Sequence, residues 1–153
     1  MLITLGVIAY QDFKDRLVWW FLYPILGVIG GYFYFEQTFD MVYLYSVGLN
    51  LLVTLAIILL VWLYVKMVIK NPFFKEAFGL GDVFLLLAFS LLFPTLSYFV
   101  FLFFSILFSI AVHLILKNFR VMKTAPLAGY VALFLIGVYG MSWTGIYQSL
   151  YLL

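Results

Sequence analysis

Six apolar runs separated by short polar breaks follow one another along the chain. The runs cover residues 1–10, 18–35, 41–65, 78–93, 96–116 and 125–141. None shows the two-residue alternation of a membrane-barrel strand, and a helix satisfies its backbone amides within its own segment, as lipid requires. The pattern therefore predicts an all-α bundle of about six helices, formed by residues 1–153 as a single membrane-embedded domain.

The composition indicates that the solvent of this bundle is mostly lipid. Of the 153 residues, 68% are hydrophobic and 9% are charged, whereas a soluble domain has about 45–50% apolar and about 25% charged residues. The chain is therefore expected to be a polytopic membrane protein in contact with lipid. A net charge of +2 is too sparse for a nucleic-acid partner. With no cysteine and one histidine, no metal and no cofactor are expected, and the oligomeric state stays open.

Two of the runs are short for a membrane span. As a helix, residues 1–10 would reach roughly 15 Å, about half of the hydrocarbon thickness. This helix is therefore expected to be shallow, tilted or sheltered. The fourth helix is expected to start near Phe78, with its first turn inside a polar cavity of the protein.

The positions of the cations predict the orientation of the bundle. All eight lie in alternate breaks: Lys14, Arg16, Lys66, Lys70, Lys75, Lys117, Arg120 and Lys123. By the positive-inside rule these breaks are cytoplasmic. We therefore expect six spans in the cytoplasmic (inner) membrane, with both chain termini on the non-cytoplasmic side.

Two of the six acidic residues differ from the others in their position. The remaining four are interpreted as solvated or locally balanced loop charges: Asp15, Glu36, Asp40 and Glu76. Asp12 directly follows the first apolar run, and Asp82 enters the fourth; an ionisable group at membrane depth indicates a functional site by default. Structural roles stay open, because Asp12 can pair with Arg16 four residues on and Asp82 can stabilise a helix N-terminus.

The segment Gly79-Leu80-Gly81-Asp82 adds a chemical hypothesis. Its glycines are expected to let the backbone bend, adopt positive φ and admit another chain closely. In the expected topology Asp12 and Asp82 belong to helix ends on the same side, so their carboxylates can face each other and share a proton. The ionised carboxylate can take a proton from an attacking water while its protonated neighbour polarises a peptide carbonyl, as in aspartic proteases.

Two motifs resemble those of a known family. The run from Gln11 to Val18 and the run Gly79-Leu80-Gly81-Asp82 are similar to motifs of the type IV prepilin peptidase and archaeal preflagellin peptidase family, which are GxGD aspartyl proteases of type IV pilus and secretion systems. The resemblance implies a six-span hydrolase that cleaves the short basic leader of prepilin-like substrates at the cytoplasmic membrane face. It assigns catalytic roles to Asp12 and Asp82 and an active-site loop to Gly79 and Gly81.

The last helix adds to the resemblance, and other positions depart from it. Residues 124–129 are similar to a proline-containing stretch of the family. Pro126 of this stretch and Arg16 of the first motif are therefore candidate substrate-binding residues. Pro126 also suits the first turn of a helix. The family commonly has a lysine where this chain has Phe84, and an Ile-Pro-Asn run where it has Val18-Trp19-Trp20. These departures bear on substrate specificity. The amino-terminal methyltransferase and cysteine-rich region of many bacterial relatives is not expected in this protein, and neither is N-methylation of the product.

Two alternatives to a protease stay open. A homologue that has lost catalysis would bind prepilin-like helices without cutting them. A small transporter subunit would use Asp12 and Asp82 to bind a cation or a proton.

Three polar residues inside the apolar runs are interpreted as structural. Asn50 and Thr54 lie one turn apart in the third run, where interhelical hydrogen bonding is expected. His113 is interpreted as a packed or interfacial histidine.

Overall fold

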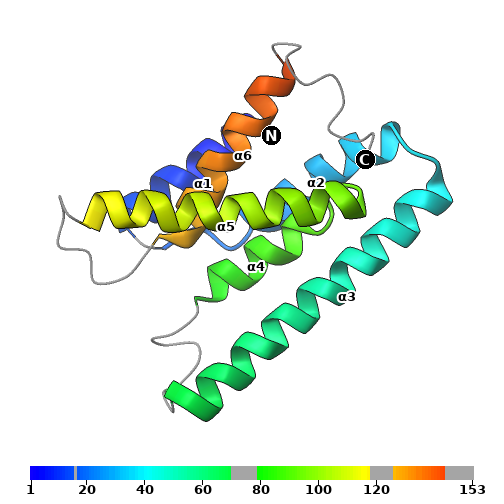
Figure 1. The fold of residues 1–153 in the computed structure, drawn as a ribbon. Coiled ribbons are helices and arrows are strands. Elements are labelled where there is room, and N and C mark those ends of the chain that lie inside the picture. Colours follow the sequence, from blue (N-terminus) through cyan, green and yellow to red (C-terminus); the bar gives the residue numbers. More distant parts are fainter. Residues whose placement is uncertain (16, 70–78, 118–125, 144–153) are drawn as a thin grey trace.

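The computed structural model describes residues 1–15, 17–69, 79–117 and 126–143, and these ranges form helices joined by short connections (Figure 1). The six α-helices are α1 (Leu2–Asp15), α2 (Leu22–Glu36), α3 (Asp40–Tyr64), α4 (Leu80–Phe89), α5 (Thr95–Lys117) and α6 (Leu127–Trp143). A π-helical turn, η1 (Val65–Ile69), continues α3. The described residues contain no strand, which confirms the all-α prediction and its number of helices.

The first helix is longer than its apolar run and is sheltered by the rest of the protein. It continues through the polar residues after Tyr10, so Asp12 lies inside a helix instead of in a connection. The side chains of Leu5 and Ile8 are fully buried, and α1 packs more extensively on α6 than on any other element (Figure 1). Of the expected arrangements for this short helix, shelter by protein is the one observed.

The fourth helix ends earlier than predicted, and another helix binds carbonyls of the connection that follows it. The start expected near Phe78 lies outside the described residues. The helix ends at Phe89, and the side-chain amide of Asn50 in α3 donates to the carbonyl oxygens of Ser90 (3.2 Å) and Phe93 (2.9 Å). Pro94 follows and disfavours a helical conformation at the residue before it. The prediction of a helix to residue 93 is therefore wrong, whereas the interhelical role predicted for Asn50 is confirmed.

Thr54 makes the second predicted interhelical contact. Its hydroxyl lies 2.8 Å from that of Tyr98 in α5, and both side chains are buried. Asn50 and Thr54 together tie one face of α3 to the connection after α4 and to the start of α5.

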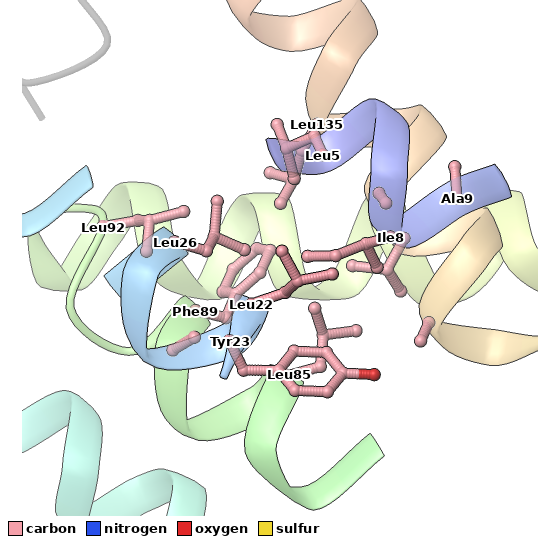
Figure 2. Packing of buried hydrophobic residues seen from close by; sticks show 14 of the residues in the cluster. Leu5, Ile8, Ala9, Leu22, Tyr23, Leu26, Leu85, Phe89, Leu92 and Leu135 are labelled. Atoms are coloured by element: carbon pink, nitrogen blue, oxygen red, sulfur yellow. The ribbon is translucent and has the colours of Figure 1, made fainter. Parts of the chain in front are cut away.

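The core lies where α1, α2, α4 and α6 meet. It is an apolar cluster to which each of these helices contributes (Figure 2), with Leu5 from α1, Leu26 from α2, Phe89 from α4 and Leu135 from α6. Glycines on α2 allow the close packing of α2 against the end of α4: a Cβ on Gly30 would lie 2.7 Å from Leu92 Cγ.

Two helices of the described residues are long and apolar enough to cross a membrane. These segments are Asp40–Met67, with 28 residues, and Thr95–Leu116, with 22 residues. In the most apolar 18-residue stretch of each helix, only 11% and 17% of the stretch is buried inside the protein. An exposed apolar surface of this extent is unfavourable in water. This exposure supports membrane association.

Candidate active site

Asp12 binds the beginning of the last helix. Its side chain is 8% exposed, and its Oδ2 accepts a hydrogen bond of 2.6 Å from the backbone amide of Gly129 in α6. The first amides of a helix have no partner within the helix, so a carboxylate is a favourable ligand for them. The predicted alternative partner, Arg16, lies outside the described residues.

Asp82 interacts with the same end of α6. It lies in the first turn of α4, and the backbone amides of Gly79 and Ala128 both interact with its carboxylate. The two aspartates also interact electrostatically with each other. The structure thus brings Asp12 and Asp82 to consecutive amides of one helix, Ala128 and Gly129, and their predicted proximity is confirmed.

Two features of the start of α6 make room for the carboxylates. Pro126 is buried just before the helix, and its carbonyl accepts the amide of Tyr130 at 3.1 Å, as expected of a proline that begins a helix. Gly129 has no side chain, and a Cβ there would lie 3.2 Å from both Asp12 Oδ2 and Phe13 Cε2. Pro126 therefore sets the start of the helix that binds both aspartates, and Gly129 admits the carboxylate of Asp12.

The glycines before Asp82 act differently from the prediction. Gly79 has φ −70° and ψ 144°, which is extended backbone that any residue adopts, so the expected positive φ is wrong. Gly81 lies within the first turn of α4, and a Cβ there would lie 2.8 Å from the hydroxyl oxygen of Tyr23. The group that lies closest to Gly81 is thus the Tyr23 hydroxyl of the same chain, and close approach by another chain stays a prediction.

Tyr23 is a residue of this site that sequence reasoning did not find. It lies in the first turn of α2, and its hydroxyl interacts electrostatically with both Asp12 and Asp82. Its ring stacks on Phe84 at 6.3 Å between centroids, so Phe84 packs beside the site. The chain has twelve tyrosines, and no sequence signal distinguishes Tyr23 from the others.

Four helix ends meet at this site. The site combines the C-terminal end of α1 with the N-terminal ends of α2, α4 and α6. In Figure 1 the C-terminal ends of α3 and α5 lie on the same side of the bundle as the N-terminal ends of α4 and α6.

The chemistry available at the site is that of two carboxylates held by helix amides and of a buried hydroxyl. Within the described ranges, no three histidine, cysteine or acidic side chains gather in a way that could hold a metal ion. The chain matches no protein-family model, no curated protein and no solved structure.

Proposed function

We propose that this chain is a membrane-embedded aspartic endopeptidase that cleaves the leader of prepilin-like proteins at the cytoplasmic membrane face. One observation carries the proposal: Asp12 and Asp82, from helices distant in the sequence, converge on the consecutive amides of Ala128 and Gly129. An aspartate that only stabilises the start of a helix needs no acidic partner. A protease of this type needs two carboxylates.

The reaction follows from sharing one proton between the two carboxylates. The ionised aspartate takes a proton from a water molecule as the water oxygen attacks the scissile carbonyl carbon. The protonated aspartate supplies a proton to the leaving nitrogen, so the C–N bond breaks to give a carboxylic acid and an amine. The amides of Ala128 and Gly129 hold the carboxylates in place during these steps, because both belong to the rigid start of α6.

The substrate is proposed to lie across residues 79–81. Gly79 is exposed and extended just before α4, so an unfolded peptide can approach the carboxylate of Asp82 there. The hydrophobic helix of a prepilin-like substrate would stay in the lipid beside α4, and its basic leader would reach the cytoplasmic side. This class of substrate is the one that the motif resemblance implies.

A cleavage assay with isosteric variants tests the proposal. The purified chain in liposomes is incubated with a synthetic peptide that has a short basic leader followed by a hydrophobic helix, and products are identified by mass spectrometry. Asp12→Asn and Asp82→Asn should each abolish cleavage, because an amide can accept the same backbone hydrogen bonds but cannot exchange the proton. Asp15→Asn is the matched control: Asp15 is exposed on α1, three residues after Asp12, and its loss should leave cleavage unchanged.

Three outcomes would contradict the proposal. Cleavage retained by both aspartate variants would remove the carboxylates from the reaction. Stable binding of the uncut peptide by the unaltered chain would identify a non-catalytic binder. Cation or proton uptake that depends on Asp82, without any cleavage, would identify a transporter.

A further inference from the structure

The hydroxyl of Tyr23 is a buried polar group whose role the two-aspartate reaction does not explain. The side chain is 1% exposed, and within the described residues its oxygen has no hydrogen-bond partner. A buried hydroxyl without a partner is unfavourable. Such a group in a candidate active site suggests that a ligand supplies the missing acceptor.

The ring of Tyr23 is held rigidly. It packs among the core residues of α2 and α4, including Leu22, Leu26 and Leu85, and it stacks on Phe84. Figure 2 shows the hydroxyl oxygen at the edge of these apolar side chains. A donor that is fixed before the substrate arrives costs no reorganisation when charge develops beside it.

The neighbours of the hydroxyl define where that charge would develop. Asp12 and Asp82 both interact electrostatically with Tyr23. The hydroxyl occupies space that a side chain at position 81 would need, and Gly81 has none. The carboxylates are engaged by the amides of Gly79, Ala128 and Gly129. Because the hydroxyl has no hydrogen-bond partner within the described residues, it can donate to a third group that lies beside the aspartates.

We propose that Tyr23 is a further catalytic residue, whose hydroxyl donates a hydrogen bond to the carbonyl oxygen of the scissile peptide as that carbon becomes tetrahedral. This inference rests on the proposed function. Tyr23 keeps its proton throughout: the water proton goes to one aspartate, the leaving nitrogen receives its proton from the other, and the hydroxyl stabilises the negative oxygen between these steps.

The Tyr23→Phe variant tests the role directly. It removes only the oxygen, so kcat for the leader peptide should fall roughly 100-fold, the effect of losing one oxyanion donor, with KM changed less than about threefold. Tyr98→Phe is the matched control. Its hydroxyl is also fully buried but bonds to Thr54, and its ring packs on Phe89 at the opposite end of α4 from Asp82; kcat should stay within about twofold.

A second variant keeps the test independent of folding defects in Tyr23→Phe. In Gly81→Ala the new Cβ would lie 2.8 Å from the hydroxyl oxygen but 3.6 Å from Cζ of the ring. The methyl group should therefore displace the hydroxyl and lower kcat in the native background. In the Tyr23→Phe background, where the oxygen is gone, the same substitution should cost much less, so the two effects should not add.

The outcomes separate this inference from the function on which it rests. If Asp12→Asn and Asp82→Asn abolish cleavage while Tyr23→Phe retains the native kcat, the role of Tyr23 is wrong and the proposed function stands. An equal cost of Gly81→Ala in both backgrounds also overturns the role of Tyr23. If the unaltered chain does not cleave the peptide, both proposals fail.

Discussion

The contact between Asp12 and Gly129 offers a sharp test of the site through a substitution of a single hydrogen atom by a methyl group. In Gly129→Ala the new Cβ would lie 3.2 Å from Asp12 Oδ2 and 3.2 Å from Phe13 Cε2. Both contacts are shorter than ordinary van der Waals distances. The carboxylate therefore has to move by a few tenths of an ångström, away from the amide that now binds it at 2.6 Å.

The expected effect is on catalysis more than on stability. Alanine is better than glycine inside a helix by about 1 kcal/mol, and this gain offsets part of the cost of crowding, so the free energy of unfolding should change by less than about 1 kcal/mol. A misplacement of about 1 Å in a catalytic group can cost roughly 100-fold in rate. A shift of a few tenths of an ångström should therefore lower kcat roughly tenfold.

The assay compares two glycines of the same helix. Gly137 also lies in α6, but a Cβ there would meet no other atom within 4 Å. Gly137→Ala should retain full cleavage and unfold at the same or a higher denaturant concentration. A Gly129→Ala variant that cleaves at the native rate would refute the argument that the start of α6 positions Asp12, and so would a loss of rate in Gly137→Ala of the same size.

Two further predictions concern the fold and the topology. Asn50→Leu should lower the free energy of unfolding by about 1–3 kcal/mol, because it leaves the carbonyls of Ser90 and Phe93 without this donor. Unfolding in detergent measures the change, and equal stability of Asn50→Leu would contradict the role of this amide. Gly48→Ala is the control and should be as stable as the native chain or more stable, because a Cβ there meets no atom within 4 Å and alanine favours the helix. A reporter fused after Leu153 should report the non-cytoplasmic side, and one inserted within residues 118–123 should report the cytoplasmic side. A cytoplasmic signal after Leu153 would contradict the six-span topology.

The helices could be predicted better than their ends. Apolar runs predict where helices lie, because burial or lipid contact is required along their whole length. The ends depend on partners from elsewhere in the chain. α1 continues past Tyr10 to Asp15, and α4 stops at Phe89 where Asn50 of α3 binds the following carbonyls. No local pattern contains those contacts.

The site was predictable for its charged residues and not for its neutral ones. A carboxylate in an apolar run is costly, so Asp12 and Asp82 stand out in the sequence itself. Tyr23 and Gly129 do not, because a tyrosine and a glycine are ordinary in an apolar helix. The role of Tyr23 depends on its hydroxyl lying beside Gly81, and the role of Gly129 depends on the carboxylate of Asp12 lying against it.

The sequence by itself determined the all-α class, the number of helices in the described part of the chain and the two carboxylates on which a function could rest. These properties depend on composition and on local periodicity, which a linear chain displays in full. The tertiary structure alone decided that the end of α1 and the beginnings of α2, α4 and α6 share one place. That meeting arises from packing between segments far apart in the sequence, where Asp12 and Gly129 are 117 residues apart, and only the folded chain brings such residues within reach of one another.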